Sequence, residues 1–143
     1  MKKIVFAGAV LAAFLSGCAS KGVQEADGDF PKASFTVDTD YESAYRRAGE
    51  FLRVCWAEAE HRYGRQYEVL RNVDRKGTLG TLSLTRPNET HRSLMLIESE
   101  PAGPRVAKVT VSVLGEAPWD DAQIDAARRS IQSATPQCLP AAS

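Results

Sequence analysis

The residues that most often carry chemistry in proteins are sparse in this sequence. Among 143 residues there are only three cysteines and two histidines, His61 and His91, which are too few for a tight metal site in a plausible arrangement. The sequence has none of the HExxH, CxxC, GxSxG or SxxK spacings that mark metal-dependent, redox or serine-based catalysis. We therefore expect a protein that is not an enzyme and that uses no metal and no cofactor.

A group of basic side chains is the second candidate for a site. If the strands of the second half form a meander, residues 61–65 lie at the same end of the sheet as the loop at 86–92. Arginines there could contact lipid phosphates or an acidic partner protein. Glutamates are interspersed, so the same arginines could instead be solubilising charges. The four arginines of this predicted basic rim are Arg62, Arg65, Arg86 and Arg92.

The overall charge argues against one class of partner. The 18 Lys and Arg residues balance the 18 Asp and Glu residues, so the chain lacks the strong positive field that is typical of nucleic-acid binding. The composition, 43% hydrophobic and 25% charged, matches an ordinary globular domain. We expect no nucleic-acid partner.

The N-terminal residues have the pattern of an export signal. Lys2 and Lys3 precede an uncharged apolar run at residues 4–15, and these are the charged and hydrophobic regions of a secretory signal peptide. The run is shorter than the approximately 20 residues that a transmembrane helix needs. The Leu-Ser-Gly-Cys sequence that follows, at residues 15–18, resembles the lipobox of bacterial lipoproteins.

This resemblance implies a location. It implies a signal peptide at residues 1–17, cleavage before Cys18, and attachment to a membrane through lipid on the Cys18 thiol. By the sorting rule of that family, Ala19 implies the outer membrane, with the domain facing the periplasm. Several acyl chains at ~0.8 kcal/mol per buried CH₂ would make the attachment effectively permanent. The alternative is an ordinary signal peptide with an accidental cysteine at its cleavage site.

Cys55 and Cys138 remain as a pair. In an oxidising compartment, an even pair of cysteines in a small domain is typical of a disulfide. Closing so long a loop would stabilise the fold by about 4 kcal/mol. Two buried free thiols, or one reactive cysteine, are the other interpretations.

The chain after Cys18 divides into a linker and a domain. Residues 18–33 are polar and contain little to bury, which predicts a lipidated cysteine followed by a flexible tether. Residues 34–143 are then a single domain.

Periodicity predicts the elements of that domain. Residues 34–38 alternate as a strand, and Thr39 and Glu42 form a capping box for a helix that continues to about Tyr63. Four further strands follow, at residues 66–73, 78–85, 93–99 and 105–114. A second helix begins after Pro118 and is stopped by Pro136.

The simplest packing of these elements is an α+β fold. Each helix has one apolar stripe and the sheet has one apolar face, which favours an antiparallel sheet of about five strands with both helices on one side. The polar face would point to solvent, and it comprises Thr81, Ser83, Thr85, Lys108, Thr110 and Ser112. The β-α-β-β-β-β-α order is similar to that of helix-grip domains in some outer-membrane assembly lipoproteins.

Two functions are consistent with these patterns. The first is a non-enzymatic binding or structural module of the cell envelope, whose partner is an envelope protein or lipid. The alternative is a small lipid or ligand carrier with a groove between the first helix and the sheet. Tyr41, Tyr45 and Phe51 would line that groove, and a closed core there would favour the module.

Overall fold

The computed structural model describes residues 22–23 and 29–140, so the predicted signal peptide and Cys18 lie outside the described residues. The order of elements is the one expected from the sequence. The strands and helices are β1 (Lys32–Val37), α1 (Tyr41–Leu52), β2 (Glu68–Val73), β3 (Gly80–Thr85), β4 (Met95–Gly103), β5 (Val106–Val113) and α2 (Asp121–Ser133).

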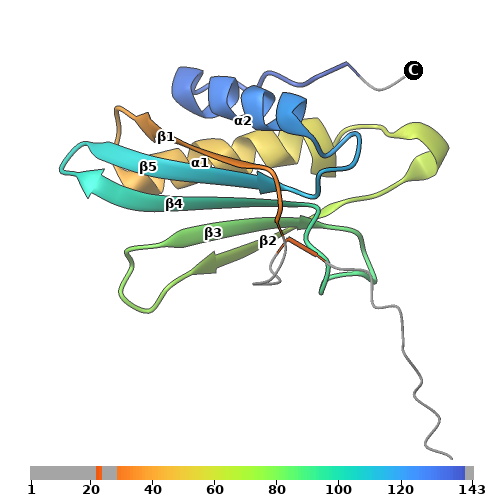
Figure 1. Cartoon of the computed structure of the whole chain (residues 1–143), viewed down its shortest axis with the longest axis horizontal. Coiled ribbons are helices and arrows are strands. Elements are labelled where there is room, and N and C mark those ends of the chain that lie inside the picture. Colours follow the sequence, from red (N-terminus) through yellow and green to blue (C-terminus); the bar gives the residue numbers. More distant parts are fainter. Residues whose placement is uncertain (1–21, 24–28, 141–143) are drawn as a thin grey trace, which may run out of the picture.

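The five strands form one antiparallel sheet in the order β1-β5-β4-β3-β2. Strands β2 to β5 follow one another as the predicted meander, and β1 adds to the other side of β5. Both helices lie on the same face of this sheet (Figure 1). The α+β fold expected from the sequence is therefore confirmed.

The core lies between the helices and the sheet. Leu82, Ile97 and Val111 are opposite one another on three neighbouring strands, and all three are buried. They belong to one hydrophobic cluster with Phe51 of α1 and Ile131 of α2. Burial of these side chains between the helices and the sheet fixes the strand register. A shift by one residue would turn every apolar side chain of a strand to the opposite face of the sheet.

The first helix differs from the prediction at both ends. Its N-cap is Asp40, whose carboxylate accepts a hydrogen bond from the Ser43 N–H at 2.8 Å, and not Thr39. The α-helix ends at Leu52, and the chain continues as a π-helical turn, Arg53–Ala57, and a short 3₁₀ turn, Arg62–Gly64. Sequence periodicity overestimated the helix because a π turn keeps helical spacing for a few residues while changing the direction of the side chains.

The polar face of the sheet is less exposed than predicted. Ser83, Thr85 and Ser112 are buried. The Ser83 hydroxyl is hydrogen-bonded to the hydroxyl of Ser93, in the segment between β3 and β4. Ser93 therefore covers Ser83, which alternation alone assigned to solvent.

Part of the predicted tether is attached to the domain. The Val23 N–H donates to the Ser93 carbonyl at 3.1 Å, and both Gly22 and Val23 are buried. The expectation of a free tether throughout residues 18–33 is therefore wrong at Gly22 and Val23, and also at Lys32 and Ala33, which belong to β1. Among the described residues, no helix has the length and hydropathy to cross a membrane.

Candidate functional site

A cleft of about 650 Å³ opens beside the end of the sheet where β2 begins and β5 ends. Three segments that are distant in sequence form its walls: residues 55–67, residues 117–123, and residues 138–140. Its aromatic lining comprises Trp56, His61, Tyr63 and Tyr67.

Packed aromatic rings support this cleft. The Trp56 ring lies 4.1 Å from that of Trp119, centroid to centroid, and the Tyr67 ring meets both edge-on, at 5.3 and 5.4 Å. All three side chains are buried. Edge-to-face pairs of this kind contribute about 0.5–1.5 kcal/mol each beyond the burial of area, so the cleft has a rigid wall.

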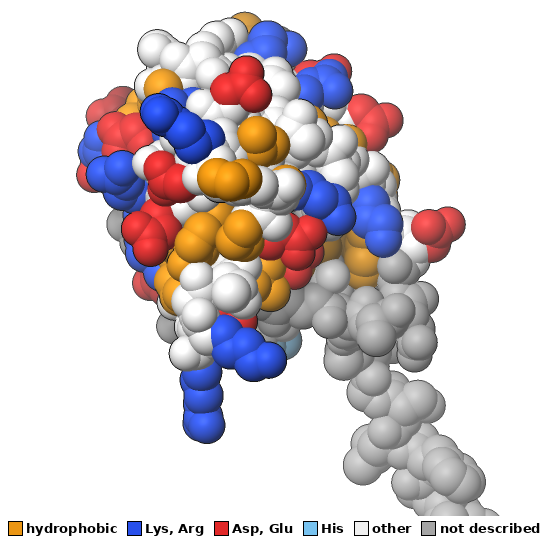
Figure 2. Space-filling view, turned by 90° about the vertical axis from the view of Figure 1, so that its left-hand side faces the viewer, with side chains coloured by type: hydrophobic (Ala, Val, Ile, Leu, Met, Phe, Trp, Pro, Cys, Tyr) orange, Lys and Arg blue, Asp and Glu red, His pale blue; other side chains and the backbone are white. Residues whose placement is uncertain are grey.

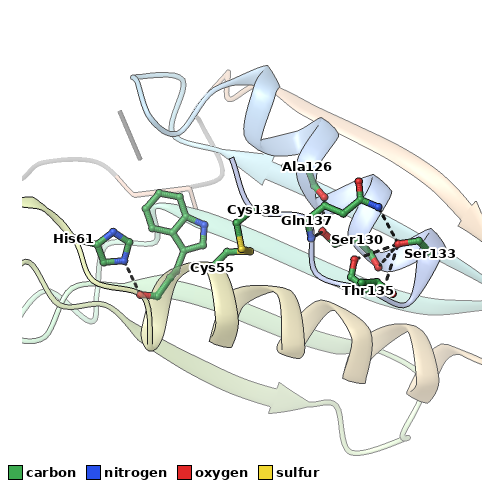
Figure 3. Close-up of a disulfide and its surroundings, with 9 residues drawn as sticks. Cys55, His61, Ala126, Ser130, Ser133, Thr135, Gln137 and Cys138 are labelled. Atoms are coloured by element: carbon green, nitrogen blue, oxygen red, sulfur yellow. Dashed lines mark hydrogen bonds between the residues drawn. A yellow bond between two sulfur atoms is a disulfide. The ribbon is translucent and has the colours of Figure 1, made fainter. Parts of the chain in front are cut away.

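A disulfide closes another wall. Cys55 and Cys138 are bonded to each other, with their Cα atoms 5.2 Å apart, which is the pairing expected from the sequence. Figure 3 shows how the chain after α2 turns back toward the end of α1 to make this bond. The return is held by Ser130, whose hydroxyl oxygen accepts the Gln137 N–H at 2.8 Å.

His61 has a structural position in this cleft. Its ring stacks on Trp56 with the centroids 5.2 Å apart, and its Nε2 lies 2.8 Å from the Trp56 carbonyl oxygen. The ring is therefore held by two contacts with the same residue. Over residues 22–23 and 29–140, no three side chains of His, Cys, Asp or Glu are grouped as they would be to hold a metal ion.

Three departures from regular structure coincide at the cleft. Cys55 and Trp56 lie in the π-helical turn, a feature that is frequent at functional sites. Tyr63 has a left-handed backbone, with φ of 61°, yet its side chain is 88% exposed. The buried Nε1–H of Trp56 has no hydrogen-bond acceptor within the described part of the chain. Strained or unsatisfied groups that collect in one place are typical of binding sites.

The structure divides the predicted basic rim into two pairs. Arg62 and Arg65 line the cleft, and the Arg65 guanidinium lies 5.9 Å from the centre of the Tyr63 ring. Arg86 and Arg92 do not line it. They lie in the segment between β3 and β4, where both are partly buried. Because β2 pairs with β3, the two pairs occupy the same end of the sheet without forming one site.

The groove predicted between the first helix and the sheet is filled. Phe51 is fully buried in the core. The Tyr41 hydroxyl donates a hydrogen bond to the Gly77 carbonyl, and the Tyr45 ring lies so close to Gly80 that an added Cβ would be 2.5 Å from it. A closed interior at this position favours the binding module over the carrier.

The opposite end of the molecule has a different surface. Figure 2 shows this end, where acidic and basic side chains are mixed and hydrophobic side chains form only small groups. No single charge or broad apolar patch dominates the view. The cleft with its aromatic lining is therefore the better candidate for a binding site.

No known family model matches this chain, and no curated protein matches its sequence. The structure alone identifies the candidate site.

Sequence reasoning missed most of the cleft. Trp119, Tyr67 and Leu139 lie in segments that periodicity treats as connections or strand ends. One available signal was the expected disulfide, which already places the residues around Cys138 beside Trp56.

Proposed function

We propose that this protein is a lipid-anchored, non-enzymatic binding module of the cell envelope, and that its aromatic cleft holds a segment of a partner protein. The observation that carries the binding site is the coincidence at one cleft of three features: the π-helical turn, the left-handed exposed Tyr63, and the Trp56 N–H, which has no acceptor among the residues that the structure describes.

The location of the module is a proposal from the N-terminal sequence. The lipobox-like residues 15–18 support lipid on Cys18, and Ala19 supports the outer membrane with the domain facing the periplasm. The two cysteines of the domain form a disulfide, which is consistent with an oxidising compartment.

The lining of the cleft favours a protein segment over a small anion. Arg62 and Arg65 are accompanied in the lining by Glu60 and Asp120, so the rim carries both signs of charge. A rim of this kind suits a peptide, which presents donors and acceptors together. Exposed tyrosine and arginine beside a buried tryptophan are also the residue types that dominate binding energy at protein interfaces.

Lipid attachment can be tested on the protein purified from native membranes. We expect mass spectrometry to find an N-terminal peptide that begins at Cys18 and carries acyl chains, and we expect Cys18→Ser to leave the protein unlipidated. An intact N-terminal segment with an unmodified thiol would contradict the anchor.

The cleft can be tested by site-specific photocrosslinking in cells. A crosslinker at position 63 should capture one defined envelope protein, whereas a crosslinker at Val73, an exposed residue on β2, should not. With the purified partner, Tyr63→Ala should weaken binding about tenfold or more, the effect of losing an interface hot spot. Val73→Ala should have no effect. Equal capture at both positions, or unchanged affinity of Tyr63→Ala, would exclude the cleft as the binding site.

A further inference from the structure

The contact made by Gly22 and Val23 determines where the anchored end of the chain meets the domain. The Val23 N–H donates to the Ser93 carbonyl at 3.1 Å. A Cβ on Gly22 would lie 2.8 Å from both the Cα of Arg92 and the amide nitrogen of Ser93, so only glycine allows so close an approach of the two backbones. This attachment lies at the segment between β3 and β4, at the end of the sheet.

The length of chain between the anchor and this contact is short. Cys18 and Gly22 are separated by four residue steps, which can span at most about 14 Å even when extended. A free tether reaching to residue 32 could span about 45 Å. The contact therefore removes most of the freedom that the tether would have given the domain.

We propose that the domain is held in one orientation on its membrane, with the segment between β3 and β4, residues 86–94, facing the lipid headgroups. This inference rests on the proposed lipid anchor at Cys18. The attachment point at Ser93 cannot move farther than about 14 Å from the lipidated residue, so the segment that contains it lies at the bilayer surface.

The charges of this segment suit phosphate headgroups. It carries Arg86 and Arg92 against the single acidic residue Glu89. The Glu89 carboxylate lies 4.0 Å from the Arg92 guanidinium. At physiological ionic strength, electrostatic attraction across solvent extends over about 8 Å. The short connection to Cys18 lets this segment approach the headgroups within that distance.

In this orientation, one end of the sheet lies near the bilayer and the other end lies away from it. The turn between β2 and β3 lies at the far end of the strands, the end seen in Figure 2. Strand β4 has nine residues, and at ~3.3 Å per residue it spans about 30 Å. The far end therefore points into the periplasm, and the aromatic cleft, at the near end, is reached close to the bilayer.

Energy transfer from the protein to the membrane tests this orientation. The lipidated full-length protein is reconstituted into vesicles of phosphatidylethanolamine and phosphatidylglycerol that contain a headgroup-labelled acceptor lipid. A donor dye is attached either to Thr90→Cys, in the 86–94 segment, or to Lys76→Cys, in the far turn. Both positions are exposed, and Cys55 and Cys138 are bonded to each other and do not react.

We expect transfer to be about threefold or more higher from position 90 than from position 76, because the length of the strands separates the two dyes. Equal transfer from the two positions, or higher transfer from position 76, would overturn the proposal. Flotation of the protein with the vesicles is measured in the same samples. Failure to float would refute the anchor itself, whereas flotation with equal transfer would refute only the orientation.

Two variants test whether the N-terminal contact sets the orientation. Gly22→Val introduces a side chain where the backbone of Arg92 and Ser93 leaves no space, and Val23→Ser removes an apolar side chain that is buried. Both residues lie outside the sheet, so we expect the near-ultraviolet circular dichroism of the domain to be unchanged. Transfer from the two positions should become equal while flotation persists. A difference that survives in both variants would show that this contact does not orient the domain.

Discussion

Gly80 is a residue at which α1 packs tightly on the sheet. It lies at the start of β3, and the Tyr45 ring occupies the space where a side chain would be, with three ring atoms within 3.0 Å of a built Cβ. These atoms include Cγ, which is close to the backbone of α1 and is not the far end of a flexible side chain. Closure of the predicted groove therefore depends on the absence of a side chain here.

We predict that Gly80→Ala lowers the free energy of unfolding by about 1–3 kcal/mol, the usual effect of overpacking. Gly103→Ala is the matched control, because a Cβ there has no neighbour closer than 3.7 Å. Urea unfolding of both variants is the measurement. Equal stability of the two variants would contradict the tight contact at Tyr45.

Asp74 is the residue that organises the turn between β2 and β3. One oxygen of its carboxylate accepts the backbone N–H groups of Thr78 and Leu79, at 2.6 and 3.1 Å. The Thr78 N–H hydrogen bond is the largest cause of a pKa below the usual 3.8. Asp40 at the start of α1 has a lowered pKa for the same reason, the backbone hydrogen bond from Ser43.

A lowered pKa in the folded state predicts how stability changes with acid. The stabilisation by each carboxylate is fully present above the unfolded pKa near 3.8 and is lost as the pH falls through the lower folded value. We therefore expect the urea concentration at the unfolding midpoint of the wild-type protein to decrease as the pH is lowered below about 4. Asp74→Asn, which keeps a hydrogen-bond acceptor without a titrating charge, should show a smaller acid dependence. An identical pH profile for the variant would contradict this role of Asp74.

The element that shapes the cleft is the π-helical turn after α1. It places Cys55 and Trp56, two consecutive residues, both in buried positions. Cys55 bonds to Cys138, and Trp56 packs on Trp119. One turn of chain thus joins the end of α1 to the segments that precede and follow α2.

We predict that removing the disulfide lowers the free energy of unfolding by about 4 kcal/mol, because the bond closes a long loop in the unfolded chain. The measurement is urea unfolding of the double variant Cys55→Ser and Cys138→Ser. Single-residue variants are avoided, because each would leave a free thiol. A loss below about 1 kcal/mol would indicate that the aromatic wall alone holds the C-terminal residues in place.

The C-terminal end of α2 contains a mismatch between residue type and conformation. Ala134 adopts a left-handed backbone, with φ of 58°, at the position where glycine is the preferred C-cap. We predict that Ala134→Gly raises the free energy of unfolding by up to about 1 kcal/mol and that Ala134→Val lowers it, since a β-branched side chain tolerates this conformation poorly. Thermal unfolding distinguishes the two variants, and a shift of the same sign in both would contradict the strain.

At the scale of the whole molecule, one layer of side chains across the sheet joins both helices to the strands. Ile97 lies at its centre, fully buried between Leu82 and Val111. We predict that Ile97→Ala lowers the free energy of unfolding by about 2–5 kcal/mol, whereas Leu70→Ala on the edge strand β2, where the side chain is 40% exposed, changes it by less than about 1 kcal/mol. Similar losses in the two variants would show that the core is not centred on this layer.

The two proposed binding features lie at one end of the molecule. The cleft is bounded by residues before β2 and after β5, and the N-terminal contact is made between β3 and β4. The antiparallel register brings these connections together at one end of the sheet. With the proposed lipid on Cys18, a partner bound in the cleft would therefore lie near the membrane.

Local pattern by itself determined the order of the elements, the antiparallel meander and the cysteine pairing. Alternation and helical spacing reflect which side of a segment is buried, so they can be recognised without knowing the partner segment. The same patterns gave wrong predictions where the local conformation or the contacts of a neighbouring segment differ from regular spacing. It extended the first helix past Leu52, and it assigned Ser83 and Val23 to solvent, although a neighbouring segment covers each of them.

Only the tertiary structure decided the site and the attachment. The cleft exists because Trp56, Tyr67 and Trp119 meet across more than sixty positions of sequence, and the N-terminal contact exists because the backbone of Gly22 fits against that of Arg92. Such contacts depend on the distances between segments after folding. Periodicity carries no information about those distances, so they were decided by how the helices, the strands and the disulfide pack together.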